Sequence, residues 1–191
     1  MSEARTVYEG KDLRIVVRGH GEYVQRTHAD GMAVIIIAVT PEDRVLFGEQ
    51  FRVPLDARTI EMPAGLVGDD HAHDTLEDAA RRELIEETGW QADRVEVLLV
   101  GPTSAGMSSE RIAFVRATGL NRVGDGGGVA GEDITVHAVP RADAPAWLMA
   151  KSAEGYELDA KLWAGLWLAD RDPDGSPANG VSESAAKMRA T

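Results

Sequence analysis

The chain contains no cysteine, which excludes disulfide bonds and any zinc site built from thiolates. This is compatible with a reducing compartment, and we expect a cytoplasmic protein. The first five residues lack the apolar core of a signal peptide, and no hydrophobic run is long enough to cross a membrane. No membrane partner is therefore expected.

Basic residues are also scarce. The chain has 20 lysines and arginines but 32 aspartates and glutamates, which gives a formal net charge of −12. A surface of this sign argues against nonspecific nucleic-acid binding. The same charge would repel a phosphorylated substrate unless metal ions and a few local arginines reverse the field at the site. With 191 residues, of which 43% are hydrophobic, a single globular domain is expected.

The pattern of apolar residues predicts both strands and helices. Strands are expected at 13–17, 22–27, 31–40, 44–51, 59–63, 95–101, 112–117 and 134–139. Helices are expected at about 75–88, 143–152 and 158–170. The Pro-, Gly- and Ser-containing end, residues 172–191, is predicted to be a disordered tail.

The first of these helices has clear boundary signals. Asp74 or Thr75 can cap it, with Glu77 or Asp78 completing a capping box. Gly89 supplies the stop. The helix is therefore expected to begin and end within the segment itself.

Three carboxylates share one face of this helix, because Glu83, Glu86 and Glu87 stand at positions i, i+3 and i+4. The opposite, apolar face should pack on the sheet through Ala79, Ala80 and Leu84. Three neighbouring anions repel one another, and a bound divalent cation would offset that repulsion. Carboxylate oxygens suit Mg²⁺ or Mn²⁺. In isolation, such a face is more often simply solvated.

The surrounding motif favours the metal site. Residues 82–90 match the second half of the Nudix box, Arg-Glu-hydrophobic-X-Glu-Glu-X-Gly-hydrophobic. In one alignment Gly68 opens the box, with Asp74 in place of its Glu. In another, Gly65 opens it and the following loop carries three extra residues. That loop contains His71 and His73, which we expect to be solvated rather than to bind a transition metal.

The second alignment depends on Glu61-Met62-Pro63-Ala64-Gly65-Leu66, which is similar to a stretch of the ADP-ribose pyrophosphatase branch. The chain thus resembles the Nudix hydrolase family over roughly residues 10–170. The resemblance implies an α/β Nudix fold, an α/β/α sandwich around a mixed sheet with an N-terminal β subdomain. It also implies a homodimer in which residues 1–30 are swapped, with the hydrolase domain over 31–171 and the tail over 172–191.

The resemblance assigns roles to individual residues. The metal ligands would be the Ala64 carbonyl, Glu83, Glu87 and Glu132. Arg82 would fix the helix, and Glu86 would be a further ligand or an aid to the attacking water. Five glycines within 124–131 predict a mobile loop that delivers Glu132. Glu132 is the best candidate for the general base, because the family's second Glu is replaced by Ala130.

Substrate contacts are implied for a further set of residues, namely Arg52, Glu61, Leu66, Ser104, Gly106 and Glu110. Ala105 replaces the Pro that marks ADP-ribose enzymes, which weakens that substrate assignment without touching the chemistry. The family's N-terminal segment usually supplies arginines to the partner's site. None stands at Tyr23-Val24, where Tyr23 could stack on a base instead.

These features predict a Nudix pyrophosphatase that uses Mg²⁺, with Mn²⁺ as the alternative. It would cleave ADP-ribose or a related nucleoside diphosphate sugar into a nucleoside monophosphate and a sugar phosphate. Two alternatives stay open. One is another nucleotide substrate, such as a dinucleoside polyphosphate or GDP-mannose. The other is a non-catalytic sensor of nucleotide sugars, against which the intact glutamates of the box argue.

Overall fold

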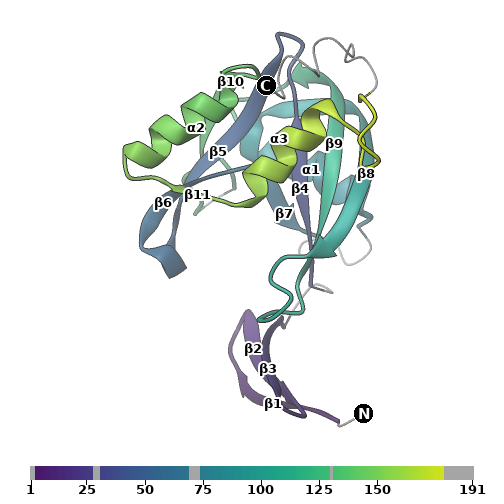
Figure 1. Ribbon diagram of the computed structural model, residues 1–191, viewed down its shortest axis with the longest axis vertical. Coiled ribbons are helices and arrows are strands. Elements are labelled where there is room, and N and C mark those ends of the chain that lie inside the picture. The colour runs from purple at the N-terminus through teal and green to yellow at the C-terminus, as the bar shows by residue number, and fades with distance from the viewer. Residues whose placement is uncertain (1–2, 28–30, 69–73, 130, 179–191) are drawn as a thin grey trace.

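The computed structural model describes residues 3–27, 31–68, 74–129 and 131–178. The expected loop histidines, His71 and His73, and Ala130 lie outside the described residues. Three strands near the N-terminus form a small antiparallel sheet that projects from the body of the molecule (Figure 1). These strands are β1 (Ala4–Glu9), β2 (Leu13–Arg18) and β3 (Gly21–Arg26). The sequence predicted the last two but not β1.

The body contains two four-stranded sheets, with strand orders β10-β5-β6-β11 and β7-β4-β9-β8. Their strands are β4 (Met32–Ala38), β5 (Arg44–Arg52), β6 (Ala57–Glu61), β7 (Ala64–Leu66), β8 (Trp90–Pro102), β9 (Arg111–Arg122), β10 (Thr135–Pro140) and β11 (Glu157–Leu158). A 3₁₀ turn, η1 (Val53–Leu55), links β5 to β6. Because β4 runs parallel to β9 and antiparallel to β7, the second sheet is mixed, as predicted.

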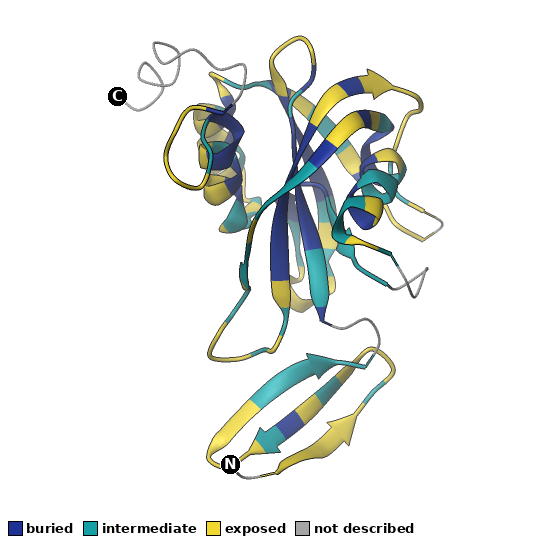
Figure 2. Ribbon diagram, turned by 90° about the vertical axis from the view of Figure 1, so that its right-hand side faces the viewer, coloured by how far each residue is buried: buried dark blue, intermediate teal, exposed yellow. Residues whose placement is uncertain are grey.

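Among the residues that the structure describes, three helices cover the sheets: α1 (Leu76–Thr88), α2 (Ala144–Ala153) and α3 (Lys161–Asp170). Strand β4 shows why they lie on opposite sides, since its successive side chains point to opposite faces. Val34 and Ile36 pack in the cluster that contains Leu84 of α1. Ile35 and Ile37 pack in the cluster that contains residues of α2 and α3. The predicted α/β/α sandwich is therefore confirmed, and the central strands are its most buried part (Figure 2).

The packed domain extends beyond residue 171, where the sequence predicted the tail to begin. Arg116 on β9 donates to the Asp172 carboxylate at 2.7 Å, and the N–H of Ala178 donates to the Asp170 carbonyl at 2.9 Å. Ala178 itself is buried. The predicted boundary was thus too early, because a buried arginine needs a carboxylate partner and finds it in the turn after α3.

In the described residues, the N-terminal sheet is hydrogen-bonded to a loop of the body. The N–H of Val24 donates to the Met107 carbonyl at 2.8 Å, and the N–H of Ser109 donates back to the Val24 carbonyl at 3.0 Å. Strand β3 is therefore hydrogen-bonded to the loop between β8 and β9, which borders the site described below. No helix in the described part of the chain is long and apolar enough to span a membrane.

Candidate active site

Helix α1 is positioned by the signals that the sequence contains. The Thr75 hydroxyl accepts from the N–H of Asp78 at 3.1 Å, and the Asp78 carboxylate accepts from the N–H of Thr75 at 3.4 Å. Gly89, at φ 72°, ends the helix in the left-handed region. The sequence offered Asp74 or Thr75 as the cap and Glu77 or Asp78 as its partner, and the structure shows that Thr75 and Asp78 form the capping box. The apolar face of α1 is buried as predicted, so its acidic face is directed toward a cavity.

This cavity has a volume of about 440 Å³ and lies between α1, the strands β4 to β7, and the loops after β8 and before β10. Ten of the twelve residues predicted for the site line it: Arg52, Glu61, Ala64, Leu66, Arg82, Glu83, Glu86, Glu87, Glu110 and Glu132. Segments far apart in the chain thus converge on a single hollow.

Ser104 and Gly106, the other two predicted residues, are not among those that line the cavity. The Ser104 carbonyl accepts from the N–H groups of Met107 and Ser108, at 3.0 and 2.9 Å, and so closes a turn. Gly106 is exposed at the tip of that turn. The turn that contains Ser104 and Gly106 therefore lies between Thr103 and Glu110, which both line the cavity.

The cavity also contains residues that the sequence did not indicate, namely Arg26, Gln50, Thr103, Asp159 and Lys161. Arg26 donates from Nε to the Glu110 carboxylate at 2.6 Å. The sequence has no arginine at Tyr23-Val24, yet Arg26 stands two residues after Val24 and so points to the same face of β3. That alternation was the available signal. No local signal marks Lys161, whose Nζ pairs with Asp159 at 2.5 Å.

Acidic groups outnumber basic ones around the cavity, with seven carboxylates against four cationic side chains. Burial raises the pKa of Glu83 to about 7, and the neighbouring Glu86 and Glu132 carboxylates also raise it, although Arg82 acts in the opposite direction. Burial raises the pKa of Glu87 to about 8, with Glu83 and Glu132 adding to the effect. The positive charge of Arg82 thus does not offset the effect of burial on the pKa values of these two carboxylates.

Glu61 behaves differently, although it is also buried. Burial alone would raise its pKa, but hydrogen bonds from Arg52 and Thr59 outweigh that effect and lower the pKa of Glu61. Arg52 donates two hydrogen bonds of 2.7 Å to this carboxylate, one from Nε and one from Nη2. The pair is therefore a fixed, charged element in the cavity wall.

The acidic residues of α1 are held by specific contacts. Arg82 donates from Nη1 to Glu83 at 2.8 Å and to Glu86 at 3.3 Å. The N–H of Ala64 donates to the Glu87 carboxylate at 3.0 Å. Gly65 leaves room for the Glu83 side chain, since a Cβ at this position would overlap the carboxylate. The Pro-Ala-Gly bend is thus fitted to the acidic face of α1.

These residues fit a divalent cation that takes part of its shell from elsewhere. Within the described residues, no three carboxylate or imidazole groups enclose a ready-made metal cage. Mg²⁺ is commonly bound by one or two carboxylates together with water and substrate phosphates. Glu83 and Glu87 supply such carboxylates, and their raised pKa values indicate that a positive charge between them would be favourable.

The described part of the glycine-rich loop packs on the end of α1, a contact that its composition did not predict. The N–H groups of Gly127 and Gly128 donate to the carbonyls of Glu87 and Glu86, at 2.8 and 3.0 Å. A Cβ at Gly126 would collide with the backbone at Thr88. The glycines therefore allow the loop to close on the last turn of α1, where helix carbonyls lack partners within the helix.

This packing brings Glu132 into the cavity beside α1. Its carboxylate accepts from the N–H of Val129 at 3.0 Å and lies so close to Gly128 that a Cβ there would overlap it. One loop thus contacts the end of α1 and presents Glu132 to the carboxylates at its acidic face.

Replacing Gly65 tests the fit between the bend and the acidic face. Gly65→Ala should displace the Glu83 carboxylate, because the new methyl group occupies its place, while the flexible glutamate can move without unfolding the domain. We expect an apparent affinity for Mg²⁺ lowered by about tenfold, measured by calorimetric titration, and a nearly unchanged melting temperature. Gly101→Ala is the matched control, since a Cβ there meets nothing within 4 Å. Equal affinity in both variants would contradict the assignment.

The raised pKa values predict how stability depends on pH in the metal-free protein. Glu83 and Glu87 keep their protons when folded at pH values where unfolded glutamates, with a pKa near 4.5, have lost them. Their stabilising effect is present below pH 4.5 and is lost as the pH rises through about 7 and 8. We expect the melting temperature of the wild type, relative to that of Glu87→Gln, to fall over this range. Addition of Mg²⁺ at pH 8.5 should reverse the fall, and a rising difference would contradict the prediction.

The chain is similar in sequence to several known proteins. The GDP-mannose pyrophosphatase of Yersinia enterocolitica is 34% identical over 137 residues, 68% of each chain. The ADP-ribose pyrophosphatase of Bacillus subtilis is 37% identical over 89 residues, 47% of this chain and 46% of that protein. The methanol dehydrogenase activator of Bacillus methanolicus is 38% identical over 92 residues, 47% of each. The chain therefore spans about half the length of the latter two relatives.

A solved structure described as an ADP compounds hydrolase superimposes with a TM-score of 0.67 and 19% identity, covering 87% of this chain and 89% of that one. At this identity the likeness concerns the fold alone. The model of the NUDIX domain matches residues 30–156, which include the whole of the acidic helix and both loops that border the cavity. Because this match spans more than half of the chain, the protein belongs to the Nudix family.

Proposed function

We propose that the protein hydrolyses the pyrophosphate bond of a nucleoside diphosphate joined to a sugar, ADP-ribose or a related compound, with Mg²⁺ as its cofactor. One observation carries the proposal: the carboxylates of α1 line the same cavity as Arg52, Glu110 and Glu132. Its volume of about 440 Å³ lies within the range of small-molecule sites. Relatives named as ADP-ribose and GDP-mannose pyrophosphatases support the substrate class.

The ion would be held by Glu83, Glu87 and the Ala64 carbonyl. When bound, Mg²⁺ would neutralise charge that develops on the diphosphate oxygens during cleavage. Arg82 keeps Glu83 and Glu86 in place through its two hydrogen bonds. Glu86 would contribute a further ligand or orient the attacking water. These roles resolve the conflict between an acidic protein and an anionic substrate.

Glu132 would act as the general base. A water molecule gives a proton to its carboxylate while the water oxygen forms a bond to one phosphorus. The bond from that phosphorus to the bridging oxygen breaks, and the bridging oxygen leaves with the other phosphate. The products are a nucleoside monophosphate and a sugar phosphate. Glu132 suits this role because its carboxylate is in the cavity and does not pair with an arginine in the contacts described.

The ends of the substrate would lie against other walls of the cavity. Arg52, which is fixed by Glu61, can contact the diphosphate or a ribose hydroxyl. Arg26 and Glu110 line a further part of the wall and offer both a donor and an acceptor. A second candidate substrate is GDP-mannose. It is favoured by Ala105, which stands where ADP-ribose enzymes have Pro, and by the Yersinia relative.

A panel of nucleotide sugars and dinucleoside polyphosphates, assayed for nucleoside monophosphate release with Mg²⁺, tests the activity. We expect turnover of ADP-ribose or GDP-mannose, and Glu87→Gln should lower kcat by at least about 100-fold, because it removes charge stabilisation in the transition state. The control is Glu77→Gln on the same helix, since Glu77 does not line the cavity. Binding without turnover across the panel would instead identify a sensor.

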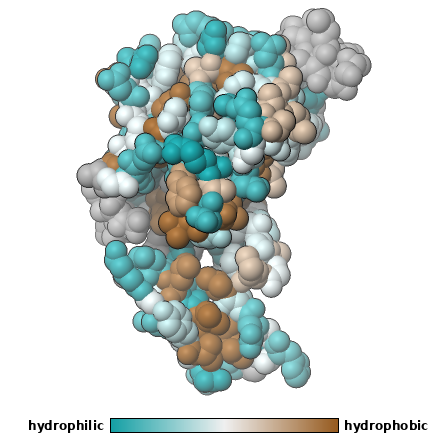
Figure 3. Space-filling view, turned by 90° about the vertical axis from the view of Figure 1, so that its left-hand side faces the viewer, coloured by the Kyte–Doolittle hydropathy of each residue, from teal (hydrophilic) through white to brown (hydrophobic). Residues whose placement is uncertain are grey.

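We also propose that the protein is a homodimer built through residues 1–30. The N-terminal sheet leaves four large apolar side chains between 40% and 61% exposed, namely Val7, Tyr8, Leu13 and Ile15. Brown apolar side chains gather on this projecting lobe (Figure 3). An exposed group of apolar side chains of this kind often marks a surface that another protein covers. A second copy would bury these apolar side chains, while the sheet keeps its main-chain bonds to the loop that borders the cavity.

Light scattering at micromolar concentration should give twice the chain mass of 20.5 kDa. Leu13→Lys should shift the protein toward the monomer, because it places a charge in the face that we expect to be buried. Val123→Lys is the matched control, since Val123 is exposed to a similar degree on the body. A wild-type monomer with full activity would contradict the proposal.

A further inference from the structure

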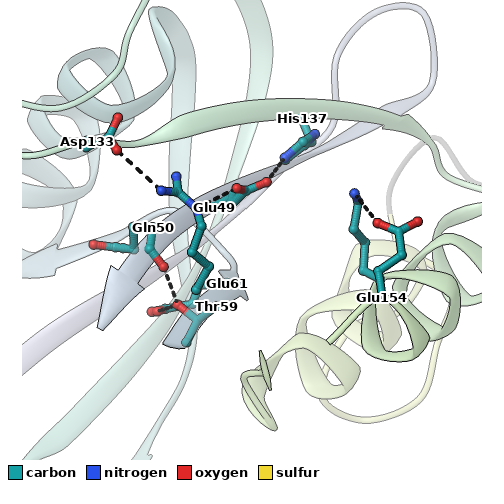
Figure 4. Close-up of polar contacts among 9 residues, drawn as sticks. Glu49, Gln50, Thr59, Glu61, Asp133, His137 and Glu154 are labelled. Atoms are coloured by element: carbon teal, nitrogen blue, oxygen red, sulfur yellow. Dashed lines mark hydrogen bonds and ion pairs between the residues drawn. The ribbon is translucent and has the colours of Figure 1, made fainter. Parts of the chain in front are cut away.

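A second polar cluster lies outside the cavity, on the sheet that contains β5. Glu49 is at its centre, with its side chain only 10% exposed. One carboxylate oxygen accepts from Arg58 Nε at 2.7 Å, and the other lies 2.9 Å from His137 Nε2 (Figure 4). Because β6 and β10 flank β5, the carboxylate links all three strands. A buried carboxylate needs such partners, so the Arg58 guanidinium is held in a single place.

The held guanidinium has a second contact. Its Nη1 donates to Asp133 Oδ2 at 3.3 Å, across 75 positions of the chain (Figure 4). Asp133 directly follows Glu132, which lines the cavity, while Asp133 itself does not. The next residue, Ile134, is buried and packs beside Gly48. The segment that presents Glu132 is thus attached to the sheet on its C-terminal side, as the glycines attach it to α1 on its N-terminal side.

We infer that Arg58 is a positioning residue, which acts through Asp133 to fix where Glu132 enters the cavity. The inference deepens the proposed function and rests on it, because it concerns the placement of the proposed general base. Arg58 and Asp133 touch neither the acidic face of α1 nor the cavity. Glu49 contributes by holding the Arg58 guanidinium, so that this one group contacts Glu49 on the sheet and Asp133 on the loop at the same time.

The exposure of the pair separates a positioning role from a structural one. Asp133 is 87% exposed and Arg58 35% exposed, and exposed ion pairs add little to global stability. Loss of the contact should therefore leave the melting temperature unchanged. It should lower the fraction of molecules in which Glu132 is in place, which reduces kcat and leaves KM unchanged.

The test measures kcat, KM and melting temperature with the best substrate of the panel. Asp133→Ala should lower kcat by about 5-fold, the upper end of what an exposed ion pair contributes. Asp133→Glu, which keeps the carboxylate, should recover most of that loss. Arg58→Lys should lower kcat similarly, because a single ammonium cannot contact both acids, and combining it with Asp133→Ala should add nothing. Glu154→Gln breaks the nearby ion pair with Lys151 and should change nothing.

The decisive comparison repeats Asp133→Ala in a Glu132→Gln background, where the effect on kcat should vanish if it acts through Glu132. The inference is overturned if Asp133→Ala has no effect, if its effect persists in that background, or if it lowers the melting temperature as much as the rate. A mild effect of Glu132→Gln alone has a different meaning, because it contradicts the general base of the proposed function.

Discussion

The burial of carboxylates on one face of α1 is the constraint on which the site depends. Glu83 and Glu87 are taken out of water beside each other, and their raised pKa values express how unfavourable that is without a counter-charge. A helix whose apolar face is anchored in the core can tolerate this repulsion, because Leu84 and its neighbours fix its orientation. The fold thus stabilises an arrangement that is electrostatically poor until a cation binds.

The surrounding elements keep that arrangement in place. The Pro-Ala-Gly bend contributes the Ala64 N–H to Glu87 and leaves space at Gly65 for Glu83. The glycine-rich loop closes on the last turn of the same helix and brings Glu132 beside it. Glycine acts in both places through the absence of a side chain, which allows close approach, rather than through flexibility.

The two ends of the described chain differ in how closely they pack on the domain. The turn after α3 packs against the body, where Arg116 donates a hydrogen bond to Asp172. The N-terminal sheet instead projects from the body, and its main-chain bonds to the 103–110 loop place Arg26 against Glu110. That contact attaches a sheet with exposed apolar side chains to the wall of the cavity.

The sequence by itself determined the features whose partners stand within one or two helical turns. The Thr75 capping box, the acidic face and the Gly89 stop all follow from local spacing, whereas the α/β/α layers were expected from the resemblance to the Nudix family. Only the tertiary structure decided which distant segments meet. The place of Lys161 and the contact between Arg58 and Asp133 depend on how distant elements pack together, which no local pattern encodes. The contact of the glycine-rich loop with the end of α1 was missed for the same reason, since the composition of the loop is the same whether or not a helix end lies beside it.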